Sequence, residues 1–194
     1  MPRRKKGNPV SGWIIIDKPI GKTSAQVVND VRRALNAQKA GHAGTLDPLA
    51  SGVLPIALGE ATKTISFAMD SLKDYQFDIS WGEERDTQDS EGRVVAKSNI
   101  RPTEEQIITA LPSFLGYIDQ VPPIFSAIKI NGRRSYDLAR NQENVILEPR
   151  KVFVESLSLI NMKDEGSATF MVTTGKGTYT VSYTHLTLPT KRIV

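Results

Sequence analysis

The sequence of 194 residues contains no cysteine, which excludes a disulfide framework, thiolate chemistry and zinc–thiolate sites. Its two histidines, His42 and His185, are too few to predict a histidine-rich metal site. No stretch is long and apolar enough to predict a membrane-spanning helix. No apolar run follows the basic N-terminal residues, as a signal peptide would require. These absences predict a cytoplasmic protein with no metal and no membrane contact.

The formal net charge of +4 permits a polyanionic partner, because cations that neutralise phosphates release counterions. Charge alone does not identify such a partner, since many basic proteins bind no nucleic acid. The basic run Arg3–Lys6 predicts a solvated, disordered tail over residues 1–11, and an RNA-binding arm is the alternative.

Hydrophobic patterning predicts both strands and helices in the first part of the chain. The apolar run in Gly12–Asp17 predicts a strand that is buried on both faces. A helix capped by Thr23 or Ser24 follows and extends to about residue 36. The many glycines and prolines of residues 39–59 predict an ordered loop without regular elements, and a second helix is expected over residues 60–69.

The rest of the chain is richer in strands. Apolar and polar residues alternate through Asp74–Trp81, which predicts a half-buried strand. Thr103 begins a capping-box motif that predicts a short helix ending at Pro112. Further elements are expected in a hairpin around the acidic turn 82–92, in strands 126–130, 152–160 and 168–174, and in a helix 135–141. This order predicts an α+β fold with a mixed, largely antiparallel sheet flanked by helices and loops.

The stretch Gly41–Gly52 is the richest in chemistry, and it reads GHAGTLDPLASG. Considered by itself, Asp47 before Pro48 in a glycine-rich loop favours a structural turn. The glycines lack the spacing of a phosphate-binding loop.

This stretch resembles the motif G-H-x-G-x-L-D-P-x-A-x-G of the TruB family, the tRNA pseudouridine synthases that modify the T-loop uridine at position 55. Further segments agree with that family in the same order, from about Gly12 to Tyr179. They read GWIIIDKPIGKTS, GEATK, KDY, DTQDSEG and QVPPIFSAIKINGRRSYDLAR. The resemblance implies the pseudouridine synthase fold, and it implies no cofactor.

The resemblance also implies roles for individual residues. Asp47 would be the catalytic carboxylate, which attacks the target nucleotide, breaks the N-glycosidic bond and lets the uracil rejoin through carbon. Tyr75 would lie against the uracil and help to remove a proton; simple packing on its strand is the alternative. His42 would contact the RNA loop, and an ordinary polar loop residue is the alternative.

The implied partner is the T-arm of tRNA, from which the target base must be flipped out. Lys18 and Lys63 would face phosphates or order the loop, and a solvated surface position is the alternative. A basic cluster would grip the RNA, unless it is an ordinary basic surface; it contains Lys129, Arg133, Arg134, Arg140, Arg150 and Lys151. The chain is expected to be a monomer without an obligate protein partner.

The chain departs from the family after Tyr179. The family continues with isoleucine and then an arginine that pairs with the catalytic carboxylate, whereas Thr180 and Val181 follow here. Valine cannot replace a guanidinium–carboxylate pair. We therefore expect a truncated catalytic domain over residues 12–180, an artefactual non-family tail over 181–194, no C-terminal RNA-binding domain, marginal stability and near-zero turnover.

Two other functions fit the sequence. A non-catalytic tRNA-binding module could open the T-arm without chemistry, which would suit the valine at position 181. A guided synthase of the H/ACA type would share the catalytic loop. The acidic turn and the insertion around Ser126–Arg140 favour the stand-alone bacterial type.

Overall fold

The computed structural model describes residues 7–126, 128–130, 132–141, 143, 145–164 and 166–180. The chain divides into two compact units, the first ending at Ser71 and the second beginning at Leu72. This division falls inside the range 12–180, for which the sequence predicts one catalytic domain. In the part of the chain that the structure describes, no helix has the length and apolar character needed to cross a bilayer.

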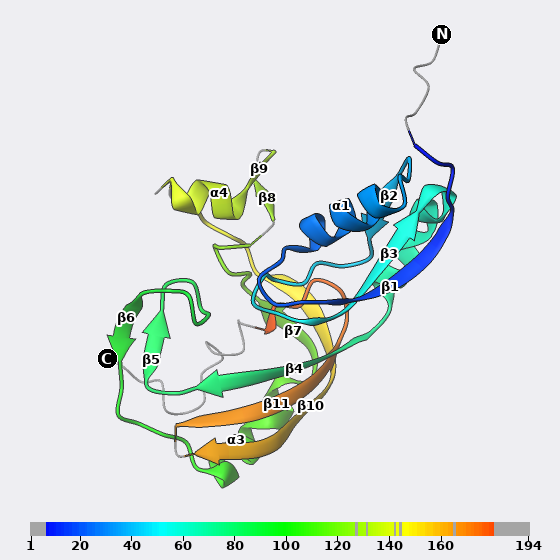
Figure 1. Cartoon of the computed structure of the whole chain (residues 1–194). Helices are drawn as coiled ribbons and strands as arrows, with labels where there is room; N and C mark the ends of the chain where they lie inside the picture. Colours follow the sequence, from blue (N-terminus) through cyan, green and yellow to red (C-terminus); the bar gives the residue numbers. More distant parts are fainter. Residues whose placement is uncertain are drawn as a thin grey trace. The chain divides into compact units, whose positions relative to one another are not determined.

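The first unit is a three-stranded antiparallel sheet with one helix packed across it (Figure 1). The strand order is β1-β3-β2, so β3 is central. The elements are β1 (Gly12–Lys18), α1 (Ser24–Ala34), β2 (Ala40–His42), β3 (Gly52–Leu58), a 3₁₀ helix (Gly59–Thr64) and α2 (Ile65–Asp70).

Helix α1 begins where the sequence predicts it. The side chain of Thr23 accepts a hydrogen bond from the amide of Gln26, and the Gln26 side chain accepts one from the Thr23 amide, so Thr23 and not Ser24 is the cap. One turn further on, Val27 and Val28 are buried against a core that includes Leu54, Ile56 and Leu58 of β3. The amphipathic face therefore fixes α1 on the sheet.

The expectation that the first strand is buried on both faces is wrong. Exposure alternates along β1, and Trp13 and Ile15 remain 39% and 63% exposed. Their neighbours Ile14 and Ile16 pack against the core below α1. A single helix covers only one face of a sheet, so a continuous apolar run does not guarantee two buried faces.

The loop predicted over residues 39–59 in fact contains two strands. Strand β3 pairs with β1 along its whole length, from Gly52 opposite Lys18 to Leu58 opposite Gly12. Pro55 lies at the edge of the pairing between β2 and β3, where its carbonyl accepts from the Ala43 amide at 2.9 Å and its missing amide costs at most one bond. The many glycines and prolines of this segment predict a loop, but pairing with strands distant in the sequence determines its structure.

Residues 7–11 belong to the tail that the sequence predicts to be disordered, but hydrogen bonds hold the start of this segment. The Asn8 amide donates to the Asn36 carbonyl at 2.5 Å, and the Gln38 amide donates to the Asn8 carbonyl at 3.1 Å. The Gln38 side chain also donates to the carbonyl of Gly7. The segment is thus held to the chain that leaves α1. Residues 1–6 lie outside the described residues.

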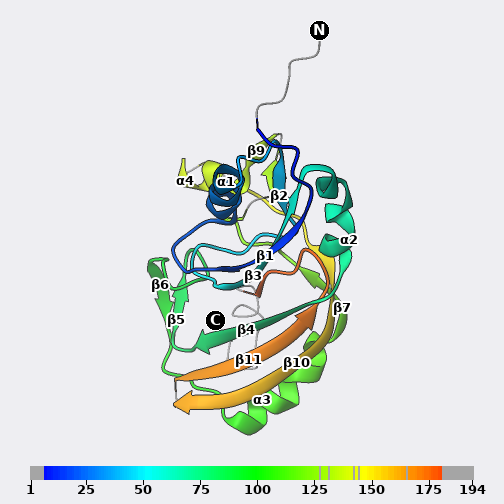
Figure 2. The same ribbon diagram turned by 45° about the vertical axis from the view of Figure 1, so that its right-hand side comes forward.

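The second unit is built on a four-stranded antiparallel sheet of order β4-β11-β10-β7. Figure 2 shows its long strands side by side, with α3 against one face. Two small hairpins, β5–β6 and β8–β9, are attached to it. The elements are β4 (Lys73–Ser80), β5 (Glu83–Arg85), β6 (Val94–Lys97), α3 (Glu104–Ala110), a 3₁₀ helix (Leu111–Phe114), β7 (Gly116–Gln120), β8 (Lys129–Ile130), β9 (Arg133–Arg134), α4 (Ser135–Arg140), β10 (Arg150–Asp164) and β11 (Ser167–Thr174).

The core of the second unit confirms the alternation predicted for the strand around Tyr75. Phe77 stacks on Phe170 of β11 with ring centroids 5.7 Å apart, and Trp81 meets the same ring edge-on at 6.4 Å. Ile107 of α3, 1% exposed, closes this cluster. Its helix carries the predicted capping box between Thr103 and Gln106. The α+β class and the largely antiparallel pairing are confirmed; strand β7 was not predicted.

Candidate active site

Asp47 lies in the loop between β2 and β3 of the first unit, and its side chain is exposed to solvent. The loop is bounded by Gly44 and Gly52, whose φ angles of +130° and +121° suit glycine. Inside the loop, the Ala50 amide donates to the Asp47 carbonyl at 3.0 Å and closes a tight turn. The sequence therefore presents this carboxylate outward and not into a core.

Two hydrogen-bonded contacts hold the chain on either side of Asp47. The hydroxyl of Ser24, at the start of α1, accepts from the Leu46 amide at 2.9 Å and donates to the Leu46 carbonyl at 3.0 Å. Ser24 is only 2% exposed, so these bonds are shielded from water. On the other side, the Gly21 amide donates to the Pro48 carbonyl at 2.7 Å. The backbone at the carboxylate is thus fixed relative to α1.

Lys18 lies at the end of β1 and is completely buried, so the alternative of a solvated surface position is wrong. Its ammonium donates to the carbonyls of Pro19 at 3.0 Å and Lys22 at 2.7 Å. Burial lowers the pKa of Lys18, while the negative charge of Asp47 acts in the opposite direction. These contacts suit a residue that orders the Pro19–Lys22 turn; phosphate contact would require the ammonium to leave both carbonyls.

His42 is the last residue of β2 and opposes Ile56 of β3. Its side chain is half-buried, and the ring atom Nδ1 is buried without a hydrogen-bond partner among the described residues. A buried ring nitrogen without a partner costs free energy that a ligand or water can recover. The role in RNA contact remains a prediction.

Tyr75 lies on β4 of the second unit, opposite Val172 of β11. Its half-buried ring packs against the cluster of Val154 and Val172. The packing role that is the alternative for Tyr75 is therefore present. This packing does not exclude a catalytic role for the phenol. Asp47 and Tyr75 belong to different units.

The basic residues expected to contact RNA have different surroundings. Lys63 is 72% exposed and pairs with Glu60 one turn earlier, which raises the pKa of Lys63. Arg133 in β9 binds both carboxylate oxygens of Glu143, at 2.7 and 3.0 Å. Lys129 and Arg134 are exposed on the β8–β9 hairpin. Arg150 and Lys151 are exposed at the start of β10, and Arg140 ends α4 with its side chain outside the described part.

Gln120, the last residue of β7, makes a contact that the sequence did not predict. Its side chain is 3% exposed, accepts from the Tyr179 amide at 2.8 Å and donates to the Tyr179 carbonyl at 3.0 Å. The hydroxyl of Thr174 adds a bond of 2.7 Å to the Phe153 carbonyl. Together these bonds hold the turn after β11 against the sheet, so the backbone of Tyr179 has a fixed position within the second unit.

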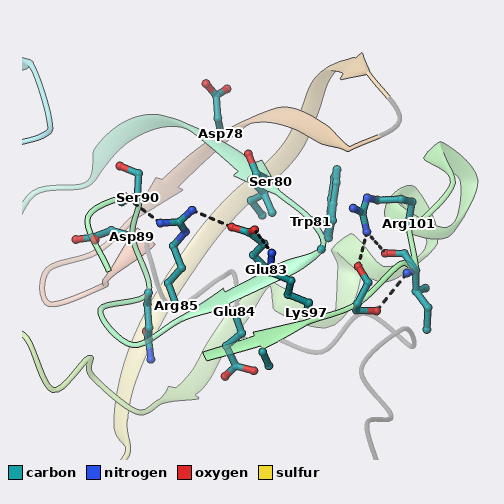
Figure 3. Close-up of a pocket in the computed structure, with 16 residues that line it drawn as sticks. Asp78, Ser80, Trp81, Glu83, Glu84, Arg85, Asp89, Ser90, Lys97 and Arg101 are labelled. Carbon is teal, nitrogen blue, oxygen red and sulfur yellow. Dashed lines mark hydrogen bonds and ion pairs between the residues drawn. The ribbon is translucent and has the colours of Figure 1, made fainter. Parts of the chain in front are cut away.

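A cavity of about 530 Å³ lies in the second unit between the end of β4, the β5–β6 hairpin and the chain leading to Arg101 (Figure 3). None of the predicted site residues lines it. Figure 3 shows Arg85 between Glu83 and the Ser90 carbonyl, with Lys97 on the other side of Glu83. Because its carboxylates are interleaved with these cations, the cavity has no single charge sign that would select a polyanion.

Comparison with known proteins defines the class. Residues 32–180 match the model described as TruB family pseudouridylate synthase (N terminal domain), and the chain belongs to this family. It is 58% identical over 176 residues to the tRNA pseudouridine synthase B of Bradyrhizobium diazoefficiens, covering 91% of this chain and 51% of that protein. It is 55% identical over 179 residues to the one of Caulobacter vibrioides, covering 92% and 58%. The chain thus spans just over half the length of these relatives.

Solved structures share the fold at lower identity. The chain superposes on a chain of a Cbf5-Nop10-Gar1 complex with a TM-score of 0.68 and 30% identity, covering 93% of this chain and 44% of that one. A structure of an H/ACA RNP bound to a substrate RNA containing 2'-deoxyuridine gives a TM-score of 0.65 and 25% identity. The identity to the two tRNA pseudouridine synthase B relatives is higher than the identity to these two chains.

Several features of the site escaped sequence reasoning. The sequence predicts Ser24 only as a candidate helix cap, although its hydroxyl holds the loop of Asp47. Gln120 carried no local signal, because its partner Tyr179 is 59 residues away. The burial of Lys18 was foreseeable only from its place at the end of an apolar strand.

Proposed function

We propose that this chain is the catalytic N-terminal part of an enzyme that isomerises the T-loop uridine of tRNA, at position 55, to pseudouridine. The observation that carries the proposal is Asp47, exposed in a loop held on both sides, in a chain of the TruB family. Relatives named tRNA pseudouridine synthase B, 55% and 58% identical, support tRNA as the substrate class.

Asp47 has the properties that the first step needs. A carboxylate can act as a nucleophile on the sugar or stabilise the positive charge that develops there. Its loop is already ordered, so little conformational entropy is lost when the substrate binds. The reaction rearranges one nucleotide without net gain or loss of atoms, and therefore no redox group or group carrier takes part.

The remaining roles concern the base and the RNA loop. The target uracil leaves its stack, which costs a few kcal/mol, and it must regain contacts in the protein. His42 contacts the opened RNA loop, and the phenol of Tyr75 assists removal of a proton once the base has rotated.

The basic residues act as phosphate contacts in this proposal. Lys129 and Arg134 are exposed on the β8–β9 hairpin and suit backbone contact. Arg133 is bound by Glu143, so it must exchange this carboxylate for a phosphate or position the hairpin instead. Lys18 orders the turn before α1 in preference to touching RNA. The chain acts in the cytoplasm as a monomer, without an obligate protein partner.

The chain in its present form is expected to bind a T-arm stem-loop but to turn over at a rate near zero, because Val181 occupies the position of the family's arginine. A chimaera tests this reasoning. In it, the sequence after Tyr179 is replaced by the continuation found in the Caulobacter vibrioides relative. Release of tritium from [5-³H]uridine in a T-arm RNA reports isomerisation.

The chimaera should form pseudouridine, and its Asp47→Asn variant should not, while both bind the T-arm RNA equally. A folded chimaera that binds RNA and forms no pseudouridine would favour the non-catalytic module that opens the T-arm. Family-like turnover by the 194-residue chain itself would refute the role given to position 181.

A further inference from the structure

The first unit carries an exposed apolar strip on the face of its sheet opposite α1. Ile15 on β1 and Val53 on β3 are 63% and 69% exposed, and Trp13 is 39% exposed. Cross-strand pairing places Ile15 opposite Pro55 and Trp13 opposite Ala57, so these side chains share one face. We call Trp13, Ile15, Val53 and Pro55 the apolar strip.

The far end of this same face is already covered. Ala57 is completely buried, and a Cβ on Gly41, the partner of Ala57, would lie 3.0 Å from the Cδ1 atom of Ile65 on α2. The 3₁₀ helix and α2 thus close the face over β2 and leave it open over β1. Asp17, opposite Val53, is the charged residue at the open end of this face. An exposed apolar strip that continues a covered part of the same face is typical of a surface that packs against further polypeptide.

The polypeptide that covers the apolar strip is limited in size. On the opposite face a single helix, α1, covers the same strands with Val27, Val28 and Val31 against Leu54 and Ile56. Sheets in domains of this kind are commonly covered by one layer of helices on each face. An amphipathic helix with its neighbouring chain therefore matches the strip.

The comparisons indicate where such a polypeptide comes from. This chain matches 51% and 58% of the length of two relatives, so those proteins contain further polypeptide that it does not match. We propose that the apolar strip is the docking surface for the segment that follows the matched region in full-length members of the family. The proposal concerns assembly, and it holds or fails independently of the chemistry assigned to Asp47.

Co-expression tests the proposal. The chain is tagged and produced together with the segment of the Caulobacter vibrioides relative that follows the matched region, so that the segment can fold on its partner. Complex formation is measured without RNA, by co-purification followed by analytical ultracentrifugation. Ile15→Lys should weaken the complex at least tenfold, about 1.4 kcal/mol, because it puts a charge into an apolar contact. The matched control is Ile160→Lys, on an exposed strand position of the second unit that is 54% exposed, and it should leave the complex unchanged.

Each outcome decides the proposal. A complex that Ile15→Lys and Val53→Lys both weaken, and that Ile160→Lys does not, supports it whether or not pseudouridine forms. No complex with the parent chain, or a complex that both strip variants retain, overturns it. Self-association that depends on the strip and is not displaced by the segment assigns the strip to a second copy. Thermal melts of the variants alone should match the parent; unfolding of both strip variants would contradict an exposed strip and overturn the proposal as well.

Discussion

Replacing Gln120 by leucine is expected to loosen the end of the second unit at a place that can be measured residue by residue. Gln120 is buried, and its amide makes both of its bonds to the backbone of Tyr179, at 2.8 and 3.0 Å. Leucine has a similar volume but can neither accept from the Tyr179 amide nor donate to its carbonyl. The change therefore removes two hydrogen bonds while leaving the packing of β7 nearly intact.

The magnitude follows from these two lost partners. A polar group left unsatisfied in a buried site costs about 1–3 kcal/mol. Tyr179 is only partly buried, so water can compensate in part, and a total of about 2 kcal/mol is expected for the two groups. For a protein of this size, such a loss lowers the melting temperature by about 4–8 °C.

Urea unfolding and amide hydrogen exchange provide the assay. The Leu variant should lose stability, and the Tyr179 amide should exchange faster than amides in the middle of β10. Gln120→Glu is the informative control, because an ionised Glu still accepts from the amide but repels the carbonyl. Only the protonated form of the glutamate side chain that this change introduces can donate to the carbonyl, so its pKa should be raised in the folded state. The free energy of unfolding of Gln120→Glu should therefore be close to that of the parent at pH 4.5 and lower than that of the parent at pH 7. A Leu variant within 0.5 kcal/mol of the parent, or unchanged protection of Tyr179, would refute the reasoning.

Two further outcomes follow from buried and paired charges. Lys18→Met should destabilise the first unit by about 2 kcal/mol in urea unfolding, because the carbonyls of Pro19 and Lys22 lose a buried donor; Lys22→Met, at an exposed pair with Asp30, should cost under about 0.5 kcal/mol. Hydrogen bonds from Lys163 and Thr169 lower the pKa of Asp78, and the Gly166 amide and the Ser167 hydroxyl lower that of Asp164. Their stabilisation is complete above the ordinary Asp pKa of about 3.9 and is lost as pH falls through the lowered folded values. Urea titrations between pH 5 and 2 should show this loss, and Asp78→Asn should flatten it; an unchanged slope would contradict the assignment.

Local sequence signals predicted the elements whose stability is local. The capping-box pattern at Thr103 predicts the start of α3, and a cap at Thr23 or Ser24 predicts the start of α1. In the structure a capping box at Thr23 and another at Thr103 each satisfy amides within one turn. The alternation through β4 likewise reports a single buried face. These features require no knowledge of distant partners.

Strands β3 and β7 were missed for the opposite reason. Strand β3 contains Pro55 and follows a glycine-rich loop, and only its pairing with β1, about forty residues earlier, makes it a strand. Strand β7 is five residues long and depends on β10 for its pairing. For the site, the resemblance supplied Asp47, but the bonds from Ser24 and Gly21 that fix its loop span 22 and 27 residues and leave no local pattern.

The anchoring of Leu46 and Pro48 has a consequence for how an RNA would be recognised. The loop acquires its shape when the first unit folds, since its two fixed points belong to α1 and the turn before it. Most of the conformational entropy lost on binding would then be lost by the nucleic acid, because its loop must unstack while the protein loop is already ordered. Selectivity would accordingly depend on how easily a given RNA loop opens, so that a weakly stacked loop would be preferred over a rigid one of identical sequence at the target base.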